Sequence, residues 1–204
     1  MKPSFRVDTD RVHWGRNEIK GADPKTFEVL NGIWACDAKH VYVFDSRLRK
    51  VDRTSFRVLN NLFAKDKDYV FYLEGIAKGC DVSTFEVLDD GETPCFGTGP
   101  EHEDACGYAR DANHVYFHEM AYGGPRKLRG VEPNNFRIIQ YAWATDGNRV
   151  FFQGERLDEA DPPTFEVVSP AFARDKQNVY WGLKIVEDAD PATYDFPDED
   201  PTFV

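Results

Sequence analysis

Long apolar runs are absent from this chain of 204 residues, and its cysteines are few. The first residues, M-K-P-S-F-R-V-D, contain no apolar stretch, and no later segment is long and apolar enough to cross a bilayer. We therefore expect no conventional signal peptide, no membrane contact and a cytoplasmic location. Cys36, Cys80, Cys95 and Cys106 are too few and too scattered for a disulfide framework. Most of them are expected to be reduced, buried thiols.

Basic residues are missing from two segments, and these segments hold the acidity of the chain. Eight acidic residues lie between Lys78 and Arg110, and seven more follow Lys184. The formal charge of the whole chain is −11, so without these 15 carboxylates the remainder carries +4. Such a field opposes direct nucleic-acid binding and favours a basic partner. A solvated surface that keeps the protein soluble explains the same charge without any partner.

A nine-residue phrase recurs six times along the chain. Its clearest copy, A-D-P-P-T-F-E-V-V, runs from Ala160 to Val168. The other copies begin at Ala22, Val51, Cys80, Val131 and Ala189. Recurrence of this kind is the signature of a tandem-repeat protein.

A second phrase precedes each copy and places an aspartate four residues before a valine, as in A-R-D-K-Q-N-V-Y-W from Ala173. These marker aspartates are Asp8, Asp37, Asp66, Asp111, Asp146 and Asp175. The aromatic residue of the first phrase follows each marker by 19 residues, or by 25 after Asp111, so all six units are in register. The six aromatics are expected to be largely buried and are Phe27, Phe56, Phe85, Phe136, Phe165 and Tyr194.

Each unit has the pattern of short strands. An aromatic three residues before the marker and a β-branched or aromatic triplet after it, such as Val41 to Val43, predict two strands joined by a turn at the aspartate. A polar turn and an aliphatic residue such as Ile19 add a third strand. In A-D-P-x-T-F, the aspartate and proline predict a short helical turn.

The predicted fold class is therefore mainly β. We expect six units of roughly 29 residues, each with about three short strands and a short helical turn, stacked as one curved open array. A typical propeller blade has four strands in about 40 to 45 residues, which is longer than these units. The array is expected to form a single domain, 1–204, with insertions at 89–107 and 118–130.

At this point the phrases resemble a known family. D-K-D-Y-V-F-Y at Asp66, D-K-Q-N-V-Y-W at Asp175 and G-A-D-P-K-T-F-E-V-L at Gly21 are similar to the DKNYY repeat family of bacterial proteins. The resemblance extends from Phe5 to Phe196 and implies a bacterial repeat protein. Because the family carries no accepted catalytic motif, the resemblance transfers no active-site residue. The two insertions depart from the repeat pattern.

Motifs with defined chemistry are weak in this sequence. An aspartate at one offset in six copies is explained by the turn it forms, whereas an active site normally requires a unique constellation. G-T-G-P-E-H from Gly97 lacks the Lys-Ser/Thr ending of a phosphate loop. Cys95, His102 and Cys106 supply only three soft ligands, at a spacing that is not typical of zinc sites. We therefore predict no catalytic residues, no metal and no cofactor, although catalytic groups distant in sequence can still meet in space.

The insertions are the most informative departures from the repeat. The third unit carries a long segment, Asp89 to Gly107, that is rich in Gly, Pro and acid and is not expected to add core. In the fourth unit His118 to Gly130 lengthens the hairpin by six residues. Inserted loops often cluster on one binding face of a repeat scaffold, although tolerated loop growth has the same appearance. His40 and His114 add a candidate polar stripe, for which a solvated row of turn residues is the alternative.

The sequence favours a non-catalytic protein that binds another protein, in particular an immunity protein that neutralises a basic bacterial toxin through its acidic surfaces. The predicted partner-binding residues are nine of the 15 acids in the two basic-free segments: Asp89, Asp90, Glu92, Glu101, Glu103, Asp104, Asp198, Glu199 and Asp200. The alternative is a carbohydrate-binding module or an uncharacterised enzyme. Three aromatics are too few and too ambiguously placed to establish a sugar platform, namely Tyr122, Phe96 and Trp143.

Overall fold

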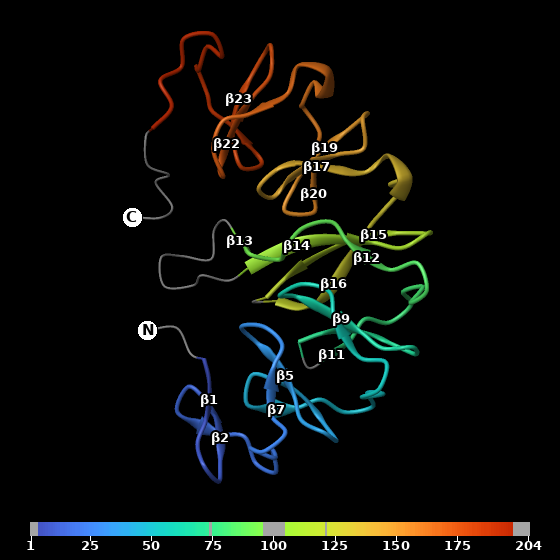
Figure 1. Ribbon diagram of the computed structural model, residues 1–204. Coiled ribbons are helices and arrows are strands. Elements are labelled where there is room, and N and C mark those ends of the chain that lie inside the picture. The colour runs from blue at the N-terminus through green and yellow to red at the C-terminus, as the bar shows by residue number, and fades with distance from the viewer. Residues whose placement is uncertain (1–3, 74, 96–104, 121, 198–204) are drawn as a thin grey trace. The chain divides into compact units, whose positions relative to one another are not determined.

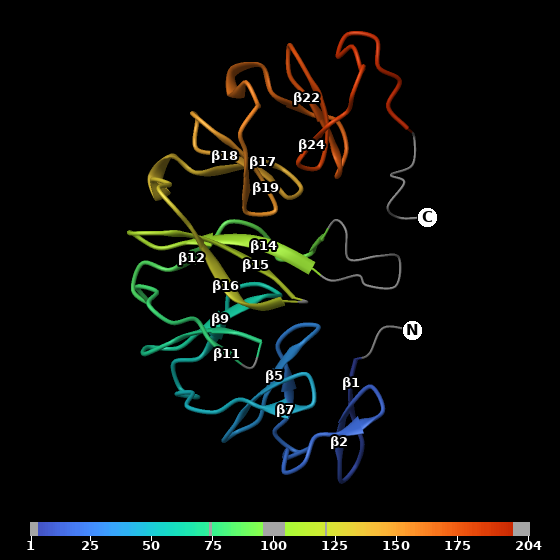
Figure 2. The same ribbon diagram turned by 180° about the vertical axis from the view of Figure 1, so that it is seen from behind.

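The computed structural model describes residues 4–73, 75–95, 105–120 and 122–197. The chain divides into two compact units, Met1–Ser83 and Thr84–Val204, and each contains three small antiparallel sheets (Figures 1 and 2). The mainly β repeat architecture predicted from the sequence is confirmed. The single domain 1–204 remains a prediction, and the two units are described separately below.

The first unit consists of three meanders in which each strand pairs with its neighbours in sequence. Their orders are β1-β2-β3, β4-β5-β6-β7 and β11-β10-β9-β8. The strands are β1 (Phe5–Val7), β2 (Val12–Trp14), β3 (Asn17–Glu18), β4 (Glu28–Val29), β5 (Trp34–Cys36), β6 (Val41–Val43), β7 (Ser46–Arg47), β8 (Arg57–Val58), β9 (Phe63–Lys65), β10 (Val70–Tyr72) and β11 (Gly75–Ile76).

The second unit repeats the same plan with longer strands in its first sheet. The orders are β12-β14-β15-β16, with β13 also paired to β14, then β17-β18-β19-β20 and β21-β22-β23-β24. The strands are β12 (Glu86–Val87), β13 (Thr93–Pro94), β14 (Ala105–Arg110), β15 (Val115–Glu119), β16 (Tyr122–Leu128), β17 (Arg137–Gln140), β18 (Trp143–Thr145), β19 (Val150–Phe152), β20 (Glu155–Leu157), β21 (Glu166–Val167), β22 (Phe172–Arg174), β23 (Val179–Trp181) and β24 (Lys184–Ile185).

Most sheets contain four strands rather than the expected three or so. The additional strand is the F-E-V-L segment of the first phrase, which begins the sheet of the following repeat. In the second sheet, Glu28 pairs with Cys36 and Val29 pairs with Ala35. A two-residue strand needs few residues, so four strands fit into a sequence much shorter than a typical propeller blade.

The phrase aromatics pack between consecutive sheets. The Phe27 ring centroid lies 5.7 Å from that of Phe5 in the first sheet and 5.7 Å from that of Tyr42 in the second. In the second unit, the Phe165 centroid lies 5.4 Å from Trp143 and 5.7 Å from Tyr180. Tilted aromatic pairs at these distances are attractive beyond the area they bury, so each phrase joins one sheet to the next.

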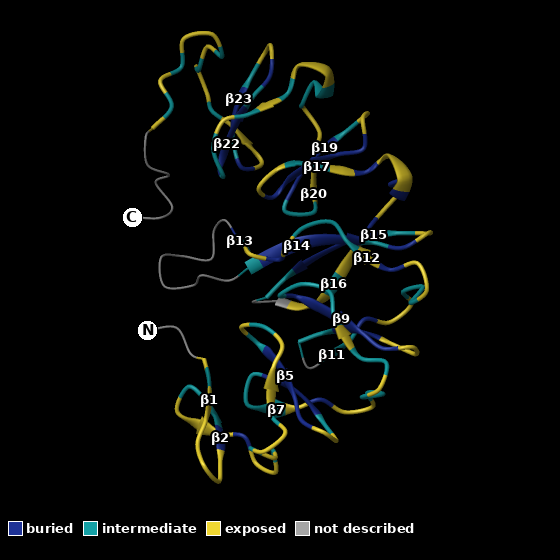
Figure 3. Cartoon of the chain, viewed as in Figure 1, coloured by how far each residue is buried: buried dark blue, intermediate teal, exposed yellow. Residues whose placement is uncertain are grey.

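Burial of the six phrase aromatics is less uniform than the sequence predicts. Phe85 and Phe136 are both 3% exposed, whereas Phe27, Phe56, Phe165 and Tyr194 are only half-buried. The fully buried positions lie instead on the central strands of each sheet, which Figure 3 shows in dark blue. Val41, Tyr42 and Val43 of β6 are all 0% exposed, which confirms that both faces of this strand are covered.

The predicted turns after the phrase acids adopt two forms. Pro133–Asn135 and Pro162–Thr164 are short 3-10 helices, and the other copies are hydrogen-bonded turns. Backbone amides are capped by the side chains of Asp23, Asp52, Asp81 and Asp190. Asp161 instead accepts a hydrogen bond from the hydroxyl of Thr164.

The insertion in the third repeat contributes to the core, contrary to the expectation from its composition. Cys95 is 4% exposed and Cys106 is 0% exposed, and both belong to a cluster that includes Tyr108. The reason is that β13 and the start of β14 extend the sheet, with Thr93 opposite Cys106. The predicted lengthening of the next hairpin is confirmed by β15 and β16. In the described part of the chain, no helix is long and apolar enough to span a membrane.

Candidate functional site

The marker aspartate is the centre of a hydrogen-bonded clamp, best seen in the second sheet. Asp37 Oδ1 accepts hydrogen bonds from the backbone amides of Lys39 and His40, both at 2.7 Å. Asp37 Oδ2 accepts one from the Tyr42 hydroxyl at 2.7 Å and one from the Asp23 amide at 3.2 Å. One buried carboxylate therefore closes the hairpin, fixes a core tyrosine and holds the segment that precedes the sheet.

The same clamp recurs through the chain. The pair of amide hydrogen bonds to one carboxylate oxygen is repeated at Asp66, Asp111, Asp146 and Asp175. Asp8, in the first sheet, is exposed. Where phenylalanine replaces the tyrosine, as at Phe151, the second oxygen of Asp146 accepts a hydrogen bond from Arg149 Nε at 2.8 Å. The prediction that the marker aspartates form turns is confirmed.

These hydrogen bonds control the ionisation of the clamp. Burial alone would raise the pKa of Asp37, but hydrogen bonds from Tyr42 and from the amides of Lys39, His40 and Asp23 outweigh it and lower the pKa to about 2. Burial and the adjacent Asp37 carboxylate raise the pKa of the Tyr42 hydroxyl. A carboxylate fixed in its charged form by four donors is suited to holding structure together rather than to exchanging protons.

Asp89, the first of the predicted partner-binding acids, points into the protein. Its Oδ2 accepts a hydrogen bond from the Tyr108 amide at 2.6 Å, and its Oδ1 accepts one from the Gly91 amide at 3.0 Å. A side chain at Gly107 would collide with this carboxylate, because its Cβ would overlap Asp89 Oδ1. Burial raises the pKa of Asp89 to about 6, although the two amides oppose the shift. Asp89 therefore anchors the insertion to β14.

The remaining predicted acids are exposed or lie outside the described residues. Asp90 and Glu92 are exposed, and the Glu92 amide donates a hydrogen bond to Asp90 Oδ1 at 3.0 Å. Six predicted residues lie outside the described residues: Glu101, Glu103, Asp104, Asp198, Glu199 and Asp200. The structure thus brings Asp89, Asp90 and Glu92 together at one end of the insertion.

The two units differ strongly in charge. Met1–Ser83 contains 15 Lys and Arg against 12 Asp and Glu, a formal charge of +3. Thr84–Val204 contains 10 against 24, a formal charge of −14. Some exposed acids of the second unit are paired with arginine, as Glu86 is with Arg110 and Glu166 with Arg174. Among the described residues, no ion pair involves the exposed acids Asp90, Glu132, Glu159, Glu187, Asp188 and Asp195.

The cysteines and histidines form no metal site in the described part of the chain. None of the four cysteines is in a disulfide; Cys36, Cys95 and Cys106 are buried and Cys80 is half-buried. No group of three or more His, Cys, Asp or Glu side chains among the described residues is arranged to hold a metal ion. His102, the third member of the candidate cluster, lies outside those residues. Independence from metal and cofactor therefore stays a prediction.

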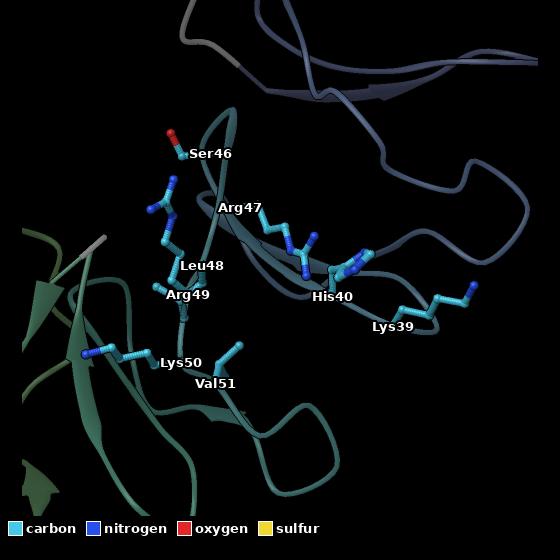
Figure 4. Close-up of a pocket in the computed structure, with 8 residues that line it drawn as sticks. All are labelled: Lys39, His40, Ser46, Arg47, Leu48, Arg49, Lys50 and Val51. Atoms are coloured by element: carbon cyan, nitrogen blue, oxygen red, sulfur yellow. The ribbon is translucent and has the colours of Figure 1, made fainter.

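A basic pocket on the second sheet was not predicted from the sequence. It has a volume of about 750 Å³ and is formed by the hairpin turn after Asp37, by β7 and by the segment that follows β7 (Figure 4). Apart from Ser46, Leu48 and Val51, its lining consists of nitrogen-bearing side chains: Lys39, His40, Arg47, Arg49 and Lys50. The sequence signal that could have revealed it is the set of basic residues at these offsets from the marker aspartate, compared with the residues at the same offsets in the other repeats.

A smaller, partly aromatic pocket lies in the second unit. It has a volume of about 320 Å³, and its lining includes Trp181, Glu119, Gln153 and Glu155. Lys184 Nζ lies 5.7 Å from the centroid of the Trp181 ring. By contrast Trp143, one of the aromatics considered for a sugar platform, is 0% exposed and cannot serve as one.

Comparison with known proteins gives one result. The model of the DKNYY family matches residues 5–155 and 143–199 of this chain. No curated protein matches the chain, and no solved structure matches it.

Proposed function

Because the chain belongs to the DKNYY family and its repeated aspartates are engaged in the clamps, we propose that it is a non-catalytic protein that binds another protein. In its most concrete form it is an immunity protein, which covers the basic surface of a bacterial toxin. The acidic second unit provides the contact surface. The protein performs no chemistry in this role, since masking the toxin is sufficient.

The observation that carries the proposal is the concentration of charge in the second unit. A formal charge of −14 on Thr84–Val204, with exposed carboxylates such as Glu187 and Asp188 outside any ion pair among the described residues, gives a strong negative field. Complementary fields accelerate encounter and select the partner. If the toxin is a nuclease, the carboxylates occupy the surface that otherwise receives phosphates.

Asp89 takes an indirect part in this surface. Its carboxylate is engaged by the amides of Tyr108 and Gly91, so it holds the insertion in place. The direct contacts are assigned to the other acids of the insertion: Asp90, Glu92, Glu101, Glu103 and Asp104. The C-terminal acids Asp198, Glu199 and Asp200 contribute to the same field.

The test begins with capture of partners from a bacterial lysate on the full-length protein. The partner is then titrated against wild type and against a variant in which Asp90, Glu92, Glu101, Glu103 and Asp104 are changed to Asn or Gln. We expect slower association for the variant at low salt and a smaller loss of rate as salt rises, because exposed charges are screened beyond about 8 Å at physiological ionic strength.

The matched control neutralises five exposed acids that are already paired with arginine. These acids are Glu18, Glu86, Glu155, Asp158 and Glu166. This control alters the net charge by the same amount but leaves the insertion unchanged, so it should retain a faster association than the loop variant. Equal affinity and equal association rate for wild type and the loop variant would contradict the proposal.

The Trp181 pocket favours a second candidate, a carbohydrate-binding module. An aromatic ring beside the carboxylates of Glu119 and Glu155 and the amide of Gln153 provides a stacking surface and hydrogen-bonding groups. A glycan array probed with wild type and with Trp181→Ala distinguishes the two functions. Oligosaccharide binding that is lost in Trp181→Ala, together with no captured protein, would favour the carbohydrate function.

A further inference from the structure

We propose that the basic pocket beside β7 binds a compact polyanion, a small molecule that carries two or more phosphate groups. The pocket is the one lined by Lys39, His40, Arg47, Arg49 and Lys50. All of these residues belong to Met1–Ser83, so the proposal is independent of protein binding by the second unit. Two features of the molecule support this site, namely the unpaired charge of its lining and the difference in charge between the repeats.

The four permanent cations of the pocket lack carboxylate partners. Among the described residues no ion pair involves Lys39, Arg47, Arg49 or Lys50. Asp37 Oδ1 lies 3.6 Å from His40 Nδ1 but is already committed to the clamp. Like charges gathered in one pocket repel one another, and an anion relieves that repulsion.

Two of the cations are presented by the geometry of an extended strand. Leu48 is 4% exposed and faces the core, and its amide donates a hydrogen bond to the Val41 carbonyl at 2.9 Å. Because side chains alternate along extended backbone, Arg47 and Arg49 both lie on the opposite side from Leu48 and are exposed. In Figure 4 Arg47 extends in the direction of His40, and Arg49 extends in the direction of Ser46. Both arginines line the pocket, and their guanidinium groups extend toward different parts of it.

The full set of five basic residues occurs only in the second repeat, the one that contains Asp37. The fourth repeat carries three of them, His114, Lys127 and Arg129, at the corresponding places. At the equivalent offsets from Asp175, the sixth repeat carries none and has Gln177, Asn178, Ile185, Glu187 and Asp188. The second and sixth repeats build the same four-stranded meander. The fold therefore does not require the cations, and a constellation that breaks the repeat is the expected mark of a binding site.

The backbone conformation at Lys50 is shared with four other repeats. Lys50 has φ 57°, and the residues at the same place are Gly21, Gly79 and Gly130, with φ 80°, 75° and 67°, and Asp188, with φ 59°. Glycine adopts this conformation freely, whereas a residue with a side chain is strained there. Because Asp188 has the same conformation in a repeat without the basic set, the charge of Lys50 and not its backbone distinguishes the pocket. A lysine in place of glycine adds one more cation to the pocket.

The size and chemistry of the pocket favour a small phosphorylated ligand. A volume of about 750 Å³ lies within the range of roughly 300 to 1,000 Å³ that small-molecule sites occupy. Guanidinium groups bind phosphate oxygens through paired hydrogen bonds. A large acidic partner is repelled by the formal charge of −11 on the whole chain, whereas a compact anion responds mainly to charges within about 8 Å. We therefore assign the site to a small polyphosphate rather than to nucleic acid or acidic protein.

The test is calorimetric titration of the full-length protein with inorganic tripolyphosphate. Wild type is compared with Arg47→Gln/Arg49→Gln and with the control Lys20→Gln/Lys78→Gln. Lys20 and Lys78 lie at the same distance from the marker aspartate as Arg49 does, in the first and third repeats. The control therefore removes the same charge outside the pocket. We expect tripolyphosphate binding that weakens about tenfold or more in the arginine variant and is nearly unchanged in the control. Far-UV circular dichroism checks that each variant is folded.

Several outcomes would overturn the proposal. These are absence of tripolyphosphate binding by wild type, equal weakening in the arginine and lysine variants, and equal affinity for citrate. Tighter binding of single-stranded DNA or of an acidic peptide than of tripolyphosphate would assign the surface to a macromolecule instead. If the glutamine variant fails to fold, Arg47→Lys/Arg49→Lys retains the charge but loses the paired geometry. Unchanged tripolyphosphate affinity in that variant would also count against the site.

Discussion

The hydroxyl of Tyr180 donates a hydrogen bond of 2.7 Å to Asp175 Oδ2, five residues earlier in the chain. The same oxygen accepts the Asp161 amide at 2.8 Å. In the second sheet, the hydroxyl of Tyr42 donates the equivalent hydrogen bond to Asp37 Oδ2, also 2.7 Å long. The hydrogen bond from the tyrosine therefore stabilises a buried carboxylate that the surrounding apolar side chains cannot solvate.

Replacing this tyrosine tests the clamp. Tyr180→Phe removes a hydrogen bond to a charged acceptor and should lower the free energy of unfolding by about 1.5 to 3 kcal/mol. Phe71 and Phe151 occupy the equivalent position in other sheets, so the ring itself is accommodated. Urea denaturation measures the change, with Tyr141→Phe at an exposed position as the control. Identical midpoints for Tyr180→Phe and wild type would show that the hydroxyl is dispensable.

The phrase aromatics should differ in their importance according to burial. Phe85→Ala, at a residue that is 3% exposed, should cost about 3 to 5 kcal/mol because it leaves a cavity. Phe27→Ala should cost less, since Phe27 is half-buried and solvent can fill part of the space. The comparison uses denaturation midpoints of the two variants. An unchanged midpoint for Phe85→Ala, or a larger loss for Phe27→Ala, would contradict this account.

Acid should weaken the clamp at Asp37 in a defined pH range. The pKa of Asp37 is lowered from 3.8 to about 2 in the folded protein, so its stabilising contribution is complete above about pH 4 and is lost as the pH falls through 2. Asp37→Asn should therefore differ most from wild type in urea midpoint at pH 5 and least at pH 2. A difference that does not change between these pH values would mean that ionisation of Asp37 is not coupled to folding.

Alkylation should distinguish the four thiols. Cys36 is 1% exposed, and burial raises the pKa of its thiol, although Arg53 opposes the shift. Cys95 and Cys106 are also buried, and Cys80 is half-buried. Iodoacetamide at pH 8 should therefore modify Cys80 first, as followed by mass spectrometry of peptides. Labelling of Cys36 or Cys106 as fast as Cys80 would indicate that the sheets open more readily than their burial implies.

Features set by neighbouring residues could be predicted from the sequence, and features set by pairing between units could not. The turn at Asp37 was predictable because its amide partners lie two and three residues away. The strand-like alternation of Phe27, Glu28 and Val29 was also visible, but its partner was not, because Glu28 pairs with Cys36 of the following repeat only after an intervening turn.

Composition misled the prediction at the insertion. Most cysteines were expected to be buried, but the Gly, Pro and acidic residues around Cys95 and Cys106 gave no local signal that the insertion pairs with the sheet and adds to its core. Asp89 was grouped with its acidic neighbours although its carboxylate serves the backbone of Tyr108. The basic pocket was missed because charge was counted along segments, where the cations near β7 are cancelled by acids elsewhere. Charge compared at each repeat offset would have revealed Arg47, Arg49 and Lys50 as a set.

The clamp has a consequence for how the gene can change. Each clamp joins residues at fixed offsets within one repeat period, such as Asp23 with Asp37 and Asp52 with Asp66. Unequal recombination that removes the DNA between two equivalent codons, for example those of Asp37 and Asp66, leaves Asp66 with its own hairpin amides and brings it the Asp23 amide in place of the Asp52 amide. Copy number can therefore drift in whole periods, whereas a deletion between Asp37 and its amide partners at Lys39 and His40 breaks that clamp.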